Sequence, residues 1–227
     1  MPGRKDIFTI GSIFHIFNKY IDGKRLFSIA NYAQLFLDTL FYYRSTKTKL
    51  SFSEFRELPN KQQLILQRQL SFKKFFLVDI LGYCLMPTHF HLILKQLSGD
   101  GIKTFMSNCI NSFTRNLNTQ LKRKGPLFLP RFQSRQIITD EQFIHVSRYK
   151  HLNPYSSGII TDITALEKYQ WSSYRYFVSK TNSSLVNTEP VLTLFDNNKD
   201  RYRSFVVKQA DYQKSLELLK YVDKWLF

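Results

Sequence analysis

Two apolar, strand-forming stretches lie almost end to end in the middle of the chain, and they constrain the fold more than any other feature. Residues 75–85 and 88–96 are rich in β-branched, aromatic and aliphatic side chains, which favour strands. Only Met86 and Pro87 separate them, and proline lacks the N–H that pairing inside a sheet requires. The pattern predicts a tight β-hairpin, and therefore a sheet that contains antiparallel strands.

The rest of the chain supplies the elements of a ferredoxin-like sheet. Apolar spacing predicts a strand, a helix, the hairpin, a longer helix, a last strand and a final helix, over residues 10–19, 28–43, 75–96, 102–121, 127–138 and 139–153. This order is the split βαβ arrangement. It predicts an α+β fold whose antiparallel sheet carries helices on one face, which leaves the other face for a ligand.

Capping residues and prolines mark the boundaries of these elements. Ser28 is the predicted N-cap of the first helix. Pro154 is expected to end the last helix of the sheet domain at Asn153, because proline disfavours the helical conformation in the residue before it. We expect a main domain over residues 1–180, with an insertion at 44–72 that contains a short helix near 61–70. A linker and a C-terminal helical extension are expected over 181–227, with an amphipathic helix from about residue 209 to 225.

The charge of the chain is strongly positive and is clustered. Lys and Arg number 33 against 17 Asp and Glu, a formal net charge of +16. No acidic residue occurs between Gly101 and Thr139, and this tract contains Lys103, Arg115, Lys122, Arg123, Lys124, Arg131 and Arg135. A charged helix face is more often simply solvated, but an uncompensated run of this length favours contact with a phosphate backbone.

Cysteine usage and the N-terminal segment indicate the compartment. The two cysteines, Cys84 and Cys109, both lie in apolar patterns, and nothing in their spacing suggests a disulfide framework. Polar residues interrupt the apolar run near the N-terminus before it becomes a signal core or a membrane span. We therefore expect a cytoplasmic protein with no membrane partner.

Two histidines open the second strand of the predicted hairpin. Successive side chains of a strand point to opposite faces, so His89 and His91 share one face while Phe90 packs into the core behind them. Two imidazoles side by side form half of a metal site, and they suit zinc or manganese. Taken alone, such a pair is more often a satisfied, half-buried pair than a ligand set.

A tyrosine on the last predicted helix of the sheet domain offers a nucleophile. Tyr149 and Asn153 are four residues apart and share a helix face, with Arg148 and Lys150 beside the tyrosine. A hydroxyl, an amide oxygen and two imidazoles would form one site, with a cation held next to a nucleophile. Each residue also has an ordinary interpretation: Tyr149 is one of 13 tyrosines, which usually pack, and Asn153 would suit a helix C-terminus.

Taken together, these segments resemble a known family. Met86-Pro87-Thr88-His89-Phe90-His91-Leu92 is similar to the HUH signature (His, hydrophobic, His) of the single-tyrosine transposases, and Arg148-Tyr149-Lys150-His151-Leu152-Asn153-Pro154 resembles their tyrosine helix. The similarity is greatest to the REP-associated tyrosine transposases of the insertion-sequence-200-like group, and it covers about residues 8–178. Two positions depart from the pattern: Thr88 stands where asparagine is common, and Tyr155 where an aliphatic residue is usual.

The resemblance implies cleavage and rejoining of single-stranded DNA. It implies Tyr149 as the nucleophile that becomes joined to a 5′ phosphate, and a divalent ion, magnesium or manganese, held by His89, His91 and Asn153. Single-stranded or hairpin DNA is the expected partner. The expected DNA contacts are Arg115, Lys122, Arg123, Arg131, Arg135, Arg148 and Lys150.

Several alternatives stay open from the sequence. A non-cleaving DNA- or RNA-binding protein that keeps the same fold is the main one, and a conventional metallohydrolase built on the His-x-His pair is another. The resemblance leaves open whether the chain acts as a monomer or as a homodimer. It also leaves open whether the tyrosine helix serves its own chain or a partner.

Overall fold

The core of the molecule is a four-stranded antiparallel sheet. The structure, a computed structural model, describes residues 7–225, with side chains up to residue 217. The strands are β1 (Ile13–Lys19), β2 (Val78–Met86), β3 (His89–Gln96) and β4 (Gln133–Ile137), in the spatial order β2-β3-β1-β4. Met86 pairs with His89 across the predicted tight turn. This order confirms the predicted α+β, ferredoxin-like fold.

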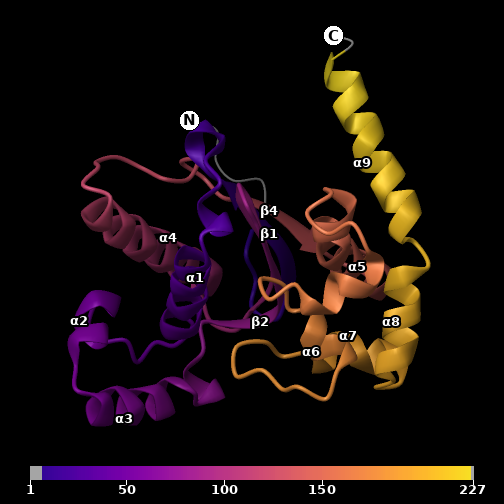
Figure 1. Ribbon diagram of the computed structural model, residues 1–227. Coiled ribbons are helices and arrows are strands. Elements are labelled where there is room, and N and C mark those ends of the chain that lie inside the picture. The colour runs from indigo at the N-terminus through magenta and orange to yellow at the C-terminus, as the bar shows by residue number, and fades with distance from the viewer. Residues whose placement is uncertain (1–6, 226–227) are drawn as a thin grey trace.

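Helices cover both faces of the sheet, but to different extents. The helices α1 (Ala30–Tyr43) and α4 (Gly101–Gln120) lie on one face, as predicted, and the apolar strand residues between them form the core. The helix α5 (Asp140–Ser156) packs against β2 on the opposite face (Figure 1). The face expected to be free for a ligand is therefore partly covered by α5. The part of this face that α5 leaves uncovered lies beside that helix.

Six further helices surround this core. They are α2 (Phe52–Glu57), α3 (Asn60–Leu70), α6 (Tyr174–Val178), α7 (Glu189–Leu192), α8 (Lys199–Val207) and α9 (Ala210–Trp225). The first two lie in the segment at 44–72, where Phe52 and Phe55 pack on Tyr42 of α1 with ring centroids 5.4 and 4.9 Å away. No helix within residues 7–225 combines the length and the apolar content needed to cross a membrane.

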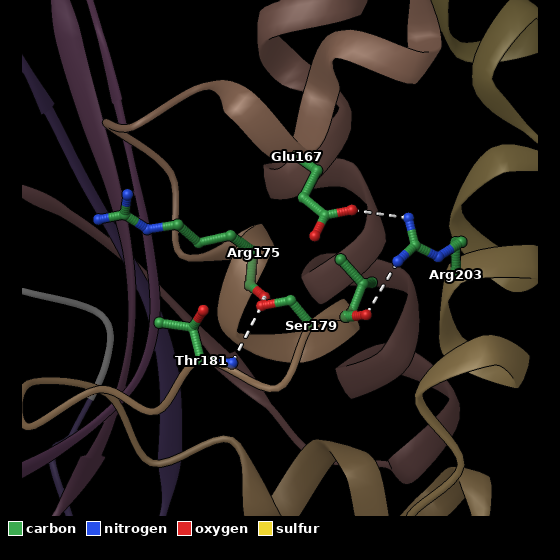
Figure 2. Close-up of polar contacts among 6 residues, drawn as sticks. Glu167, Arg175, Ser179, Thr181 and Arg203 are labelled. Carbon is green, nitrogen blue, oxygen red and sulfur yellow. Dashed lines mark hydrogen bonds and ion pairs between the residues drawn. The ribbon is translucent and has the colours of Figure 1, made fainter.

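The C-terminal segment is anchored to the rest of the molecule by polar contacts. Arg203 of α8 donates to Glu167 at 2.8 Å and to the carbonyl oxygen of Val178 at 2.9 Å, and Figure 2 shows its side chain reaching Glu167. Arg44, which follows α1, donates to the carbonyl oxygen of Ser184 at 2.6 Å. The expected linker is thus held near the end of α1 at Ser184, and α8 is held to the segment that precedes the linker.

Three predicted boundaries were wrong. Ser28 does not cap α1, because it belongs to a short 3₁₀ turn and Ile29 occupies the N-cap position. The last strand spans only 133–137, since Pro126 and Pro130 cannot donate to a ladder. Helix α5 continues through Pro154 to Ser156.

The continuation of α5 has a physical cause. Pro154 removes one backbone donor from the helix, yet the next turn still closes, because the amide N–H of Ser157 donates to the carbonyl oxygen of Asn153 at 3.0 Å. Leu152 and Tyr155 are both buried in this last turn. Tertiary packing of these side chains therefore outweighs the local preference of proline.

Candidate active site

His89 and His91 project from the face of the sheet that α5 covers. They alternate along β3 with Phe90, which is fully buried under α1 and α4. The centroids of the two imidazole rings lie 4.9 Å apart, with the ring planes nearly perpendicular. His91 is deeply set, with 6% of its surface exposed, whereas His89 is only partly buried.

Tyr149 lies next to His91 within the same chain. Its ring centroid is 6.1 Å from that of His91, and the ring planes meet at 85°. Helix α5 brings it there: the Thr139 side chain caps the helix by accepting from the backbone N–H of Gln142, and the buried side chain of Phe143 fixes its first turns. The tyrosine and the histidine pair predicted from the sequence therefore form one cluster.

Both histidines contact another side chain of the protein through Nδ1. Nδ1 of His89 lies 3.0 Å from the hydroxyl oxygen of Thr88. Nδ1 of His91 lies 2.9 Å from Nε2 of His15, which comes from β1. Nε2 is the other nitrogen of each ring, and it is the atom that would bind a ligand at this site.

Burial keeps these imidazoles neutral. Desolvation, followed by the positive charges of Lys150 and Arg135, lowers the pKa of His15 to about 4. Desolvation is also the main cause that lowers the pKa of His89 and, by a larger amount, that of His91. A neutral imidazole keeps one nitrogen lone pair, which is the form that binds a metal ion.

Asn153 lies one turn after Tyr149, at the interface with the C-terminal helix. Its side chain is buried, and its Oδ1 atom accepts from Nε2 of Gln213 at 3.4 Å. The same Gln213 atom donates to the carbonyl oxygen of Tyr149 at 3.1 Å. Glu217, one turn further along α9, is close enough that its carboxylate raises the pKa of His89, against the larger opposite effect of burial. Helix α9 thus forms a wall of the site.

Lys150 does not lie where the sequence placed it. It was expected to contact DNA, but its side chain has 0% exposure and points at β2. A Cβ atom added to Gly82 would lie 1.7 Å from its Nζ, so any other residue at position 82 would force the lysine amine to move. Nζ has no hydrogen-bond partner among the described residues, and burial lowers the pKa of Lys150 to about 7.

Arg135 shares the face of the histidines, and the loop after α4 lies at the edge of the sheet. Arg135 on β4 pairs with His15 on β1, and its side chain is exposed on the same side of the sheet. The loop after α4 borders the His89 end of β3, because Leu129 donates its N–H to the carbonyl oxygen of Lys19, the partner of His89. The exposed side chains of this loop include Lys122 and Arg131.

The remaining basic residues are placed differently. Arg115 is exposed on α4 beside α2, on the opposite side of the sheet from the histidines. Arg123 folds back on its own loop, donating to the side chain of Asn118 and to the carbonyl oxygen of Pro126. The guanidinium of Arg148 bonds Nδ1 of His145 at 2.7 Å and lies 4.4 Å from the centroid of the Phe205 ring.

A divalent cation at this site would have few donor atoms from the protein. The described residues contain no group of three or more His, Cys, Asp and Glu side chains arranged for a metal ion. Two imidazole nitrogens and the amide oxygen of Asn153 would leave further coordination positions to oxygen atoms of a phosphate or of water. The fixed Nδ1 contacts of both histidines are the kind of support that metal-binding imidazoles receive.

Two contributors to the site were missed in the sequence. The first is His15, which lies on a different strand from the histidine pair. Its spacing from His91 carries no signal, and only the register of β1 against β3 brings the two rings together. Gln213 was also missed, since nothing in an amphipathic helix about sixty residues after Tyr149 marks its contact with that residue.

Comparison with known proteins supports the fold alone. No model of a known protein family matches the chain, and no curated protein sequence matches it. Among solved structures, that of the REP-associated tyrosine transposase bound to a REP hairpin is similar, with a TM-score of 0.56 and 13% sequence identity. The similarity covers 82% of this chain and 94% of that one.

Proposed function

We propose that this chain is a metal-dependent single-strand DNA transposase of the HUH single-tyrosine type. One observation carries the proposal: the ring of Tyr149 lies 6.1 Å from the ring of His91, the inner member of the histidine pair, in the same chain. The solved structure with the same fold is that of a transposase bound to a REP hairpin, which supports hairpin DNA as the substrate class.

The proposed reaction is a transesterification by Tyr149. Its hydroxyl oxygen forms a bond to the phosphorus of a phosphodiester, and the bond from that phosphorus to the 3′ oxygen breaks. The phenolic proton passes to solvent, and the released 3′ oxygen takes up a proton to become a hydroxyl. The product is a 5′-phosphotyrosine, and attack by a 3′ hydroxyl in the reverse sense rejoins the strand without ATP.

His89, His91 and Asn153 are the residues proposed to hold magnesium or manganese. Such an ion, when bound, polarises the scissile phosphate and stabilises charge on the leaving oxygen. The neutral state of the two histidines favours this role, because burial lowers the pKa of both. Gln213 orients the Asn153 side chain by donating to its Oδ1 atom.

We further propose that DNA follows the basic surface beside the histidine pair. Its contacts would be Arg135, Arg131 and Lys122, which are exposed along β4 and the loop after α4. The main domain at 1–180 would carry this surface and the reaction. The extension at 181–227 would hold the tyrosine helix through α8 and α9, so that the helix serves its own chain.

The test is formation of a covalent adduct. The chain is mixed with a labelled single strand that forms a hairpin, with Mn²⁺ or Mg²⁺ present, and the products are separated under denaturing conditions. A labelled protein band is expected for the unaltered chain and none for Tyr149→Phe. Tyr32→Phe is the matched control, because Tyr32 lies on α1 on the other side of the sheet, and it should form the adduct normally.

Other outcomes would point to the competing functions. An adduct that persists in Tyr149→Phe would refute the assigned nucleophile. Tight hairpin binding that a chelator does not affect, with no adduct under either metal, would favour a non-cleaving nucleic-acid-binding protein. Release of free 5′ phosphate without a covalent step would favour a metallohydrolase.

A further inference from the structure

His15 and His91 form a buried imidazole pair on the face of the sheet that carries the site. Nε2 of His15 lies 2.9 Å from Nδ1 of His91, and the ring centroids are 5.1 Å apart at an interplanar angle of 24°. Exposure is 8% for His15 and 6% for His91. The pair crosses diagonally between strands, since β1 places Phe17 and not His15 directly opposite His91.

A hydrogen bond between two neutral imidazoles has only two possible assignments. In the first, Nδ1–H of His91 donates to Nε2 of His15, and the lone pair of His91 resides on Nε2. In the second, Nε2–H of His15 donates to Nδ1 of His91, so that Nε2 of His91 carries the proton instead. Only the first leaves Nε2 of His91 able to bind a cation beside Tyr149.

We propose that His15 is a positioning residue which accepts a hydrogen bond from Nδ1–H of His91 and so fixes the tautomer that presents Nε2 of His91 to the site. The metal-binding consequence rests on the proposed function, whereas the hydrogen-bond assignment does not. Thr88 supports the same arrangement at the neighbouring ring, because its hydroxyl lies 3.0 Å from Nδ1 of His89. Both histidines would then offer Nε2 in the same direction.

Packing restricts the two rings. The Phe17 ring lies 5.1 Å from His15 and 5.9 Å from His91, between centroids, and limits rotation of both rings. Packing therefore holds the two rings in place, and the proton between them decides which nitrogen of His91 keeps a lone pair.

Histidine side-chain nitrogen spectra of the metal-free chain test the assignment directly. Long-range ¹⁵N–¹H correlations distinguish a protonated ring nitrogen from one that carries a lone pair. We expect His91 to have its proton on Nδ1 and its lone pair on Nε2. The reverse pattern would overturn the proposal, whatever the chain does to DNA.

Variants of His15 test the consequence for metal binding. His15→Phe keeps a ring but has no acceptor, and its dissociation constant for Mn²⁺ should rise by about 10- to 100-fold. His15→Gln places a carbonyl oxygen near the position of Nε2, and should restore binding to within roughly threefold of the original. Phe17→Leu is the control, because it alters packing beside both rings without removing a polar atom.

The outcomes separate this proposal from the proposed function. Unchanged Mn²⁺ affinity in His15→Phe, together with a normal DNA adduct, would overturn the role of His15 and leave the transposase assignment standing. An unaltered chain that forms no adduct but shows the expected His91 tautomer would refute the function and support the hydrogen-bond assignment. Should His15→Phe fail to fold, His15→Gln and the spectra of the unaltered chain still decide the question.

Discussion

Lys150 is a lysine whose amino group lies in the interior without a partner among the described residues. Burying an unpaired ammonium is costly, so the group gives up its proton more readily than in water. Burial accordingly lowers the pKa of Lys150 from 10.5 to about 7. The site therefore contains, behind the histidines, an amine that changes its charge near neutral pH.

This pKa predicts that the protein gains stability as the pH rises above neutrality. Between about pH 7 and pH 10 the unfolded chain binds the Lys150 proton and the folded chain does not, so the free energy of unfolding increases by at most about 1.4 kcal/mol per pH unit. Urea unfolding at about pH 7.5 and about pH 9 measures this change. In Lys150→Met the increase should be lost.

The groups that face Lys150 contribute differently to the slope. Burial raises the pKa of the Cys84 thiol to about 12, so this thiol, which ionises at about pH 8.5 in the unfolded chain, opposes the gain above that pH, and removing Lys150 leaves its contribution in place. Burial lowers the pKa values of His15, His91 and His151, so these rings are neutral throughout the window. Lys124→Met, at an exposed loop position, is the control and should keep the slope of the unaltered chain. An equal slope in Lys150→Met and the unaltered chain would contradict the prediction.

At the scale of residues, the sequence predicted which candidate side chains lie together better than it predicted what supports them. His89, His91 and Tyr149 lie in local patterns whose strand and helix periods give their faces, and the structure places His91 and Tyr149 together. Lys150 was expected to contact DNA because it flanks Tyr149 and a charged side chain is normally solvated. The space that admits it is created by Gly82, on a strand far away in the sequence.

Among the elements, α5 depends on α8 for its polar contacts. The hydroxyl of Tyr202 lies 2.7 Å from the Ser147 hydroxyl and 2.7 Å from Nδ1 of His151, and both partners are on α5. Nε2 of His151 continues the network to the Ser173 hydroxyl at 2.9 Å, which in turn donates to the carbonyl oxygen of Tyr83 on β2. A single buried chain of polar groups thus joins α8, α5 and the sheet.

Tyr202→Phe should lower the free energy of unfolding by about 1–3 kcal/mol, because it leaves two buried polar groups unpaired. The control is Tyr212→Phe on α9, where the side chain is 64% exposed and the same substitution should change stability little. Urea unfolding of both variants provides the comparison. Equal stability of the two variants would show that the network does not support α5.

The elements themselves were largely predictable, and the exceptions have local causes. Both strands of the hairpin and the helices α1, α4 and α9 follow clear apolar periods, and the structure has them within a few residues of the predicted bounds. The length of β4 was overestimated, because an apolar run between prolines resembles a strand even when it forms a loop. The end of α5 depends on packing that follows from no local pattern.

For the molecule as a whole, the basic residues are distributed unequally between the two faces of the sheet. The exposed Arg135 lies on the face of the histidines, whereas Arg115 faces away beside α2. A formal net charge of +16 would attract nucleic acid to any part of the surface. A single-strand substrate engaged at the proposed site should nevertheless neutralise phosphates mainly on the histidine side.

This difference predicts how salt affects binding in two matched variants. Each phosphate contact on a single strand contributes about 0.7 to the slope of log affinity against log salt concentration. Arg135→Gln should reduce the magnitude of that slope by about this amount, while Arg115→Gln should leave it unchanged. Fluorescence anisotropy with a hairpin-bearing oligonucleotide over a salt series measures both. A larger effect from Arg115→Gln would place the DNA on the other side of the sheet.

The close approach of Gly82 and Lys150 also limits which substitutions the sequence can accept at these two positions. An alanine at position 82 would bring its Cβ atom to 1.7 Å from Nζ of the lysine, so the buried amine would have to move or residue 150 would have to become shorter. A shorter residue at 150, accepted first, would leave an unfilled space against the sheet. The two positions are therefore expected to change together in homologous chains.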